Sequence, residues 1–282
     1  MKLSIIIPVY NEARSLNKNM QQVKDTAKKI RGCEIIYIDD CSKDNSYTLL
    51  KKGKGIRVLR HQINKGYGAS LKTGIKAAKG EWIAIADADG TYPIKDIPKL
   101  LKYMPQYDMV VGSRTGANVN IPLQRKPAKW FLNKFASFLA GKKIPDLNSG
   151  LRVFRKDIAL EFWNLFPQRF SFTSTITMAC MTNGYQVKYI PINYFKRKGK
   201  SSISPFDFYN FTNLLLRLTL FFKPLKIFGS LAILLLLGSI FVFVYSTYFL
   251  GRFMDTTTLV LFMSSLQMLS FGLLAHIVIN RR

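Results

Sequence analysis

The chain has few acidic residues, few histidines and few cysteines, and each shortage narrows the chemistry open to it. Only 16 aspartates and glutamates stand against 42 lysines and arginines in 282 residues, so we expect an anionic partner: nucleic acid, an anionic membrane surface or a phosphorylated substrate. The histidines, His61 and His276, lie in unrelated contexts, which argues against histidine acid–base catalysis and a zinc site. Cys33, Cys41 and Cys180 lack metal-ligand spacing and fit a reducing compartment.

Complete phosphate-binding fingerprints are also missing. Gly66-Tyr67-Gly68 begins like a dinucleotide motif, but Leu71 stands where the third glycine belongs. Gly199-Lys200-Ser201 ends like a P-loop, but Tyr194 stands where its first glycine belongs. The sequence has no helix-turn-helix, zinc-finger or RNA-binding sheet signature, so we do not expect nucleic acid as the partner.

Charge is absent from two long apolar segments, 227–250 and 258–279. Each is long enough to cross the ~30 Å hydrocarbon layer of a membrane, and the short loop between them predicts a transmembrane hairpin. Basic residues flank the outer ends of the pair (Lys223, Lys226, Arg281, Arg282), whereas the loop has only Arg252. The positive-inside rule therefore predicts a multi-pass cell-membrane protein whose N-terminal domain is cytoplasmic. The apolar run after Met1 breaks at Pro8, so we do not expect a signal peptide there.

The first 111 residues alternate strand and helix patterns, as a parallel sheet covered by helices requires. The predicted strands are 3–9, 34–38, 56–60, 82–86 and 109–111. The predicted helices are 13–30, 45–52, 68–78 and 94–103. This pattern predicts an α/β fold.

Polar residues follow three of the predicted strands. Asp87-Ala88-Asp89 follows the strand at 82–86, Asp39-Asp40 follows the second strand, and Asn11-Glu12 follows the first. Carboxyl ends of parallel strands meet at one edge of a sheet, where α/β proteins bind ligands. Buried carboxylates there require a cation or hydrogen-bond donors, and Mg²⁺ or Mn²⁺ carrying a diphosphate is the simplest candidate. An ordinary turn at Asp89-Gly90 is the other interpretation.

Two basic amphipathic stretches follow the predicted sheet. The stretch 125–143 carries Trp130, Phe131 and Phe138 among lysines, and is compatible with a helix at the lipid boundary or one packed on the sheet. The stretch 206–222 lies just before the first apolar segment, and we expect it to be an interfacial helix.

Ordered motifs along residues 3–205 resemble those of the membrane-anchored polyisoprenyl-phosphate glycosyltransferases of family 2. The motifs are Ser4-Ile5-Ile6-Ile7-Pro8-Val9-Tyr10-Asn11-Glu12, Ile38-Asp39-Asp40-Cys41-Ser42, Asn64-Lys65-Gly66-Tyr67-Gly68, Asp87-Ala88-Asp89, Gly112-Ser113-Arg114, Leu147-Asn148-Ser149-Gly150-Leu151-Arg152 and Lys196-Arg197-Lys198-Gly199-Lys200-Ser201-Ser202. The resemblance implies a GT-A domain over 1–204 with a mixed, mainly parallel sheet, an interfacial region over 205–226 and a membrane hairpin over 227–282.

The resemblance also implies an inverting, metal-dependent transfer from a UDP-sugar or GDP-mannose to a polyisoprenyl phosphate. The donor would contact Pro8, Tyr10, Glu12, Asp39, Asp40, Lys65, Gly66, Asp87, Ala88, Asp89, Arg197 and Lys200. Mg²⁺ or Mn²⁺ would be held by Asp89 and Asp87, with Thr91 as a weaker third ligand. Relatives often carry glutamine as a further ligand where this chain has Thr91, whose hydroxyl is a poorer ligand.

The acceptor phosphate would be bound by Arg114, Arg125, Lys129 and Ser149. With Asp87 and Asp89, we place Arg114 and Asp146 among the catalytic residues. Asp146 stands where relatives with hydroxyl acceptors keep a catalytic carboxylate, and here it is a candidate base or a group that orients Arg152 or the acceptor. Two alternatives remain: a hydroxyl acceptor, and a non-catalytic scaffold that binds anionic lipids. A homo-oligomer through the hairpin is compatible with the sequence.

Overall fold

The computed structural model describes residues 2–104, 106–119, 126–168, 171–196, 223–251 and 255–280, together with 213, 216, 220 and 221. Contacts divide the chain into two compact units, each considered by itself. One comprises Met1–Phe138 and Lys142–Thr212, and the other Leu139–Gly141 and Asn213–Arg282. Arg125, Arg197, Lys200 and most of the predicted interfacial helix over 205–226 lie outside the described residues.

The described part of the first unit is built on a seven-stranded sheet of order β3-β2-β1-β4-β6-β5-β7. The strands are β1 Leu3–Val9, β2 Cys33–Asp39, β3 Arg57–Arg60, β4 Trp82–Ile85, β5 Met109–Ser113, β6 Arg152–Arg155 and β7 Val187–Pro191. The four strands β1 to β4 are parallel, whereas β6 runs antiparallel to both β4 and β5. All residues of β1 are buried, which explains why this central strand is an almost unbroken apolar run.

Helices cover both faces of the sheet. They are α1 Ala13–Ala27, α2 Ser46–Lys51, α3 Tyr67–Ala77, η1 Ile94–Asp96, α4 Ile97–Leu101, α5 Lys126–Ala140, α6 Lys156–Glu161, η3 Trp163–Leu165 and α7 Phe172–Thr182. Because side chains alternate along a strand, Ile5 of β1 packs with Leu16 of α1 and Ile97 of α4, while Ile6 faces α3. A Cβ atom at Gly74 of α3 would lie 2.4 Å from Ile6 Cγ2, so this helix needs glycine there to approach the sheet.

The sequence predicted the five strands up to residue 113 to within a few residues at each end, but three details differ. The helix predicted over 13–30 ends at Ala27, and the chain turns through Gly32, whose φ is 72°. The helix predicted over 94–103 begins as the 3₁₀ turn η1 and continues only to Leu101. The elements β6, α6, α7 and β7 lie between residues 150 and 192, where no element was predicted.

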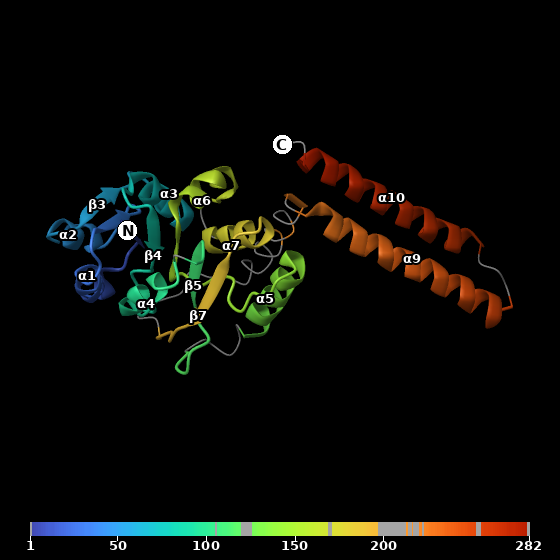
Figure 1. The fold of residues 1–282 in the computed structure, drawn as a ribbon, viewed down its shortest axis with the longest axis horizontal. Helices are drawn as coiled ribbons and strands as arrows, with labels where there is room; N and C mark the ends of the chain where they lie inside the picture. Colours follow the sequence, from blue (N-terminus) through green and yellow to red (C-terminus); the bar gives the residue numbers. More distant parts are fainter. Residues whose placement is uncertain are drawn as a thin grey trace. The chain divides into compact units, whose positions relative to one another are not determined.

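The second unit contains two long helices, α9 Pro224–Tyr248 and α10 Asp255–Asn280, which lie side by side (Figure 1). Ser239 Oγ donates to Thr258 O and Ser265 Oγ donates to Ala232 O, both at 2.9 Å. A hydroxyl that donates to a carbonyl of the neighbouring helix has its hydrogen-bond partner without water. With mean hydropathies of 2.7 over Pro224–Tyr248 and 1.7 over Thr256–Ile279, both helices are long and apolar enough to cross a membrane.

Candidate functional site

The carboxyl ends of β1, β2 and β4 bring the predicted acidic residues to one edge of the sheet. Asp39 ends β2, Asp40 follows it, and Asp87 and Asp89 lie just beyond β4. The parallel pairing of β1 with β2 and with β4 makes this convergence unavoidable. Asp39, Asp40 and Asp89 are buried, with exposed fractions of 0%, 3% and 9%.

Asp40 organises the loop that enters α3. The backbone N–H of Lys65 donates to its Oδ1 at 2.9 Å, and the N–H of Gly66 donates to its Oδ2 at 2.7 Å. Gly66 has a φ of 97°, a backbone conformation that favours glycine. The carboxylate therefore fixes the conformation of this loop, and a direct contact of Asp40 with the nucleotide stays a prediction. The buried Oδ1 of Asp39 has no hydrogen-bond partner among the described residues, which makes Asp39 the better candidate for that contact.

His61 belongs to this cluster, although its sequence context suggested no role. Its Nδ1 lies 2.7 Å from Asp40 Oδ1, and its Nε2 lies 2.9 Å from Thr73 Oγ1. The ring is 6% exposed and links the loop after β3 to α3. His61 thus holds the Asp40 carboxylate in place, and that carboxylate in turn holds the loop at Lys65 and Gly66.

Hydrogen bonds join the turn after β1 to the turn after β2. The N–H of Asn11 donates to Ser42 Oγ at 3.1 Å, and Asn11 Oδ1 accepts the N–H of Lys43 at 2.8 Å. Asn11 and Cys41 both have positive φ, 55° and 60°, at the points where the chain leaves the strands. Such strained backbone persists where neighbouring contacts hold it, and it clusters at functional sites.

The other residues predicted to contact the sugar-nucleotide donor lie on the same segment of chain: Pro8, Tyr10 and Glu12. Tyr10 is 43% exposed, whereas Pro8 is buried inside β1. Glu12 accepts a hydrogen bond from Ser15 Oγ at 3.3 Å. Of the three, Tyr10 presents the largest side-chain surface at the carboxyl edge.

Helix α1 and Tyr67 hold the Asp87-Ala88-Asp89 segment. Asn19 Nδ2 donates to the carbonyl of Asp87 at 3.2 Å, and Ser15 Oγ donates to the carbonyl of Ala88 at 2.9 Å. The hydroxyl of Tyr67 donates to Asp87 Oδ1 at 2.9 Å. Burial raises the pKa of Tyr67, and the adjacent Asp87 charge raises it further, so the phenol stays a donor.

Thr91 supports Asp89 from the protein side. Its hydroxyl donates to Asp89 Oδ1 at 2.7 Å and its N–H donates to the same oxygen at 3.0 Å. Thr91 is fully buried, and its hydroxyl orients the carboxylate. A metal contact of Thr91 itself stays a prediction.

The carboxylates of Asp87 and Asp89 suit Mg²⁺ or Mn²⁺ only when a bound substrate and water complete the coordination. Asp87 and Asp89 offer carboxylate oxygens, the atoms that these ions prefer. No group of three or more His, Cys, Asp or Glu side chains that could hold an ion occurs among the described residues. Mg²⁺ is commonly bound through one or two carboxylates plus substrate phosphates and water, and the pair fits this arrangement.

Asp146, Arg114 and Lys129 form an ion-pair cluster beside the carboxylates. Arg114 grips Asp146 through Nε to Oδ2 at 2.8 Å and Nη2 to Oδ1 at 2.7 Å, and its backbone N–H donates to Oδ2 at 2.8 Å. Lys129 Nζ of α5 lies 3.4 Å from Oδ2. Among the described residues, none accepts a hydrogen bond from Nη1 of Arg114.

The cluster keeps Asp146 ionised. Burial alone would raise the pKa of Asp146, but the hydrogen bonds and charge of Arg114, followed by the charge of Lys129, lower it from 3.8 to about 2. Burial and the neighbouring Arg114 lower the pKa of Lys129. A carboxylate with so low a pKa, both of whose oxygens already accept hydrogen bonds, is a poor general base.

Gly150 joins the two halves of the site. A Cβ atom placed there would lie 2.7 Å from Asp87 Oδ2, so the backbone of the loop that carries Asp146 packs directly on this carboxylate. The N–H of Gly150 donates to the hydroxyl of Tyr92 at 2.8 Å. Tyr92 meets Tyr194 edge-on with ring centroids 5.1 Å apart, and Arg114 lies 5.3 Å above the Tyr194 ring.

Arg152 positions that loop without contacting Asp146. It is fully buried, and its guanidinium donates to carbonyls and a hydroxyl: to Ser149 O at 3.0 Å, and to Thr173 O and Thr177 Oγ1 at 2.8 Å each. The expectation that Asp146 orients Arg152 is therefore wrong, because Asp146 pairs with Arg114 and Lys129 instead.

Ser149 does not present its side chain to a ligand. It is fully buried, and its hydroxyl donates to the carbonyl of Gly112 at 2.5 Å. The predicted contact of Ser149 with an acceptor phosphate does not match this placement, because the hydroxyl ties the loop to β5.

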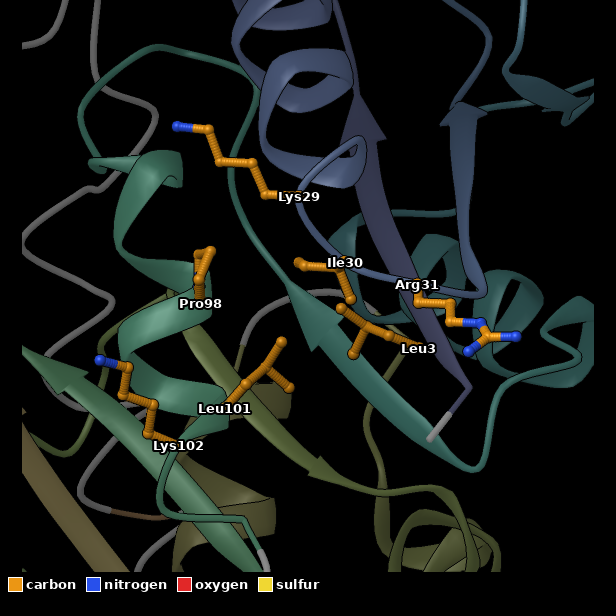
Figure 2. Close-up of a pocket in the computed structure, with 7 residues that line it drawn as sticks. All are labelled: Leu3, Lys29, Ile30, Arg31, Pro98, Leu101 and Lys102. Carbon is orange, nitrogen blue, oxygen red and sulfur yellow. The ribbon is translucent and has the colours of Figure 1, made fainter.

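A groove of about 400 Å³ lies elsewhere, at the amino end of β1 (Figure 2). Leu3, Ile30 and Leu101 form its apolar floor. In Figure 2 the side chains of Lys29 and Lys102 extend to the left and that of Arg31 extends to the right, and their charged ends do not meet at one point. The groove is at the opposite end of β1 from the carboxylates and is separate from the site.

Residues that the sequence analysis missed are mostly polar residues in buried positions. Ser15 and Asn19 are 8% and 1% exposed on the face of α1 that also buries apolar residues. Ser15 and Asn19 are polar residues four positions apart on an otherwise apolar helix face, and this spacing was the signal in the sequence that could have identified them. Tyr67, Tyr92 and His61 gave no comparable pattern, because their partners lie far away in the sequence.

Comparisons with known sequences agree with the motif assignment. The family described as "Glycosyl transferase family 2" matches residues 4–163. An uncharacterised protein of Methanocaldococcus jannaschii is 30% identical over 219 residues, covering 73% of this chain and 88% of its own length. The undecaprenyl-phosphate mannosyltransferase of Micrococcus luteus is 26% identical over 217 residues, and the dolichyl-phosphate hexose transferase of Haloferax volcanii is 26% identical over 207 residues. These two alignments cover 72% of this chain and 88% and 87% of the respective relatives.

Solved structures share the fold. TarS of S. aureus in complex with UDP-GlcNAc is similar with a TM-score of 0.56 and 19% identity, over 77% of this chain and 66% of that chain. Glucosyl-3-phosphoglycerate synthase of Mycobacterium tuberculosis, in complex with Mn²⁺, UDP and phosphoglyceric acid, gives a TM-score of 0.60 and 14% identity, over 77% and 78% of the two chains. At these identities the likeness concerns the fold alone.

Proposed function

The chain belongs to glycosyl transferase family 2, and on that premise we propose that it transfers a sugar, with inversion, from a nucleotide-diphosphate donor to a polyisoprenyl phosphate at the cytoplasmic face of the membrane. It is a glycosyltransferase, and the predicted GT-A fold, a mixed and mainly parallel sheet, is confirmed. Relatives named for undecaprenyl-phosphate and dolichyl-phosphate sugar transfer support the acceptor class.

The observation that carries the choice of acceptor is the cluster of Asp146 with Arg114 and Lys129. A hydroxyl acceptor requires a base to take its proton, whereas a phosphate monoester is already mostly ionised near neutrality. Asp146 has a pKa of about 2 and is held by two cations, so its environment suits anion positioning and not proton removal. The geometry thus favours an acceptor that brings its own charge.

In the proposed reaction, Arg114 and Lys129 orient the acceptor phosphate while Asp146 holds the two cations in place. Nη1 of Arg114 would donate to the phosphate, and arginine suits such an oxyanion because its donors are fixed in a plane. One phosphate oxygen attacks the anomeric carbon as the bond from that carbon to the donor diphosphate breaks. The electron pair of that bond leaves with the nucleoside diphosphate, and a single displacement inverts the anomeric configuration.

On the donor side, Asp87 and Asp89 would hold Mg²⁺ or Mn²⁺, and that ion would neutralise charge on the departing diphosphate. Tyr67 and Thr91 orient the two carboxylates, and the loop fixed by Asp40 forms the neighbouring wall. The buried Oδ1 of Asp39 offers an acceptor to the nucleotide base. Arg197 and Lys200 remain predicted contacts to the diphosphate.

The helices α9 and α10 would anchor the enzyme next to its lipid substrate. Their length and hydropathy support a hairpin that crosses the membrane twice. The excess of basic residues at its outer ends supports the cytoplasmic placement of the N-terminal unit. The domain boundaries near 204 and 226, and a homo-oligomer through the hairpin, stay predictions.

The test supplies purified protein in lipid with a panel of radiolabelled UDP- and GDP-sugars, Mg²⁺ or Mn²⁺, and three acceptors: polyisoprenyl phosphate, the dephosphorylated polyisoprenol and a glycan. We expect a metal-dependent, mild-acid-labile lipid product from the phosphate alone. Transfer only to the alcohol or the glycan would establish a hydroxyl acceptor, and binding of anionic lipid without any transfer would establish a scaffold.

Matched variants locate the chemistry. Arg114→Lys should raise the KM for polyisoprenyl phosphate more than the KM for the donor, since lysine lacks the fork that grips Asp146 and the phosphate together. The control is Arg155→Lys, because Arg155 pairs with Asp108 and Asp157 on the exposed surface. Equal effects of Arg114→Lys on the two KM values would remove Arg114 from acceptor binding.

A further inference from the structure

The ring of Tyr194 lies against the guanidinium of Arg114. The Cζ atom of Arg114 is 5.3 Å from the ring centroid, within the range of a cation–π contact. One edge of the same guanidinium pairs with Asp146, through Nε to Oδ2 at 2.8 Å and Nη2 to Oδ1 at 2.7 Å. Arg114 is thus held along one edge by a carboxylate and over one face by an aromatic ring.

The two contacts fix different features of the guanidinium. The hydrogen bonds to Asp146 set where its edge lies, but the planar group can still tilt about the line through Nε and Nη2. A ring over one face restricts that tilt, because a cation is attracted to the negative face of an aromatic ring and not to its edge. The tilt decides the direction of Nη1, the nitrogen that would donate to the acceptor phosphate.

The turn after β4 holds the Tyr194 ring and its backbone in place. Tyr92 is 4% exposed and meets Tyr194 edge-on, with ring centroids 5.1 Å apart. The backbone N–H of Phe195 donates to the carbonyl of Thr91 at 2.9 Å. The N–H of Tyr194 donates to the carbonyl of Asn118, also at 2.9 Å. Because ring and backbone are both anchored, Tyr194 offers a fixed surface to the guanidinium.

The same turn carries Asp89, one of the two carboxylates proposed to hold the metal ion. The hydroxyl of Thr91 donates to Asp89 Oδ1 at 2.7 Å, and the next residue, Tyr92, contacts the ring of Tyr194. Contacts therefore connect Asp89 with Arg114 through Thr91, Tyr92 and Tyr194. The cation proposed to bind the acceptor phosphate is thus oriented by the part of the chain that supports the donor carboxylate.

We propose that Tyr194 is a positioning residue for the acceptor phosphate: its ring sets the tilt of Arg114 and so aligns Nη1 with the carboxylates at which the donor diphosphate would bind. Tyr194 acts through Arg114 and not on a substrate. A small misplacement of the attacking oxygen lowers the rate strongly, so the alignment affects kcat as well as acceptor binding. This role rests on the proposed function, whereas the contact between Tyr194 and Arg114 does not.

Steady-state kinetics of the full chain in lipid separate positioning from simple packing. Tyr194→Leu removes the aromatic face, and should raise the KM for polyisoprenyl phosphate about fivefold and lower kcat while the KM for the donor is unchanged. Tyr194→Phe keeps the face and should restore both values. The matched control is Phe195→Leu, which should behave as the wild type because that neighbouring ring is 42% exposed. Equal rises in the two KM values, or a Tyr194→Phe protein as impaired as Tyr194→Leu, would overturn the proposal.

Thermal unfolding tests the contact without catalysis. Tm is measured in detergent for Tyr194→Leu, for Arg114→Lys and for the protein with both changes. Since residues in contact do not contribute additively, the double variant should lose less Tm than the sum of the two single losses. Additive losses would show that the two side chains do not interact, and would overturn the proposal. Non-additive losses in a wild type that transfers no sugar to polyisoprenyl phosphate would retain the contact and reject the proposed function, and with it the role in acceptor binding.

Discussion

Asp146→Asn is expected to destabilise the N-terminal unit strongly, although it changes one carboxylate into an amide of the same shape. Arg114 and Lys129, whose side chains are 15% and 23% exposed, would lose the carboxylate with which both pair and would face an amide that donates instead. Removing one partner from a buried ion pair costs about 3–5 kcal/mol. The fall in the pKa of Asp146 from 3.8 to about 2 gives an independent figure of about 2 kcal/mol.

A loss of about 3 kcal/mol corresponds to a decrease in Tm of roughly 6–12 °C for a unit of this size. Thermal unfolding of the full chain in detergent, followed by tryptophan fluorescence, measures it, because every tryptophan lies in the first unit. The control is Asp157→Asn, whose aspartate pairs with Arg155 at 61% exposure and should change Tm little.

The pH dependence has a defined sign. Since folding lowers the pKa of Asp146, its stabilisation is fully present above about pH 4 and is lost as the pH falls through about 2. The difference in Tm between the wild type and Asp146→Asn should therefore be largest at neutral pH and shrink toward pH 2. An Asp146→Asn protein that melts with the wild type at pH 7, or a difference that grows in acid, would refute the ion-pair reasoning.

Three further outcomes are expected. Asp89→Ala should abolish turnover and the metal dependence of donor binding while Tm changes little. Isothermal titration with the nucleotide diphosphate at several Mn²⁺ concentrations measures that dependence. Metal-enhanced binding by the variant would remove Asp89 from the metal site. His61→Ala leaves Asp40 Oδ1 without its ring partner, so the KM for the donor should rise several-fold while the acceptor KM stays unchanged in steady-state kinetics; equal rises would contradict a role confined to the donor side. Gly150→Ala places a methyl group 2.7 Å from Asp87 Oδ2 and should lower kcat at least about tenfold in a folded protein, as judged by circular dichroism; wild-type kcat would show that the loop yields.

The sequence predicted much of the fold because the signals are local. The apolar runs of β1 and β4, each ended by polar residues, predict parallel strands and their carboxyl edge without knowledge of any distant contact. The two long apolar helices follow from length and hydropathy alone. By contrast, β6, α6, α7 and β7 were missed, since buried helix α7 is rich in threonine and β6 pairs antiparallel in an otherwise parallel pattern.

The amino-acid sequence by itself determined the family, the α/β class and the set of carboxylates and cations from which the site is built. Only the tertiary structure decided which of them act together. In the structure, the hydroxyl of Thr91 donates to Asp89. Asp40 contacts His61 and accepts hydrogen bonds from the loop before α3. Asp146 forms its ion pair with Arg114 and not with Arg152. The physical reason is that a side chain's protonation and availability depend on partners and burial, and the partners of Asp40 and Asp146 lie tens of residues away in the chain.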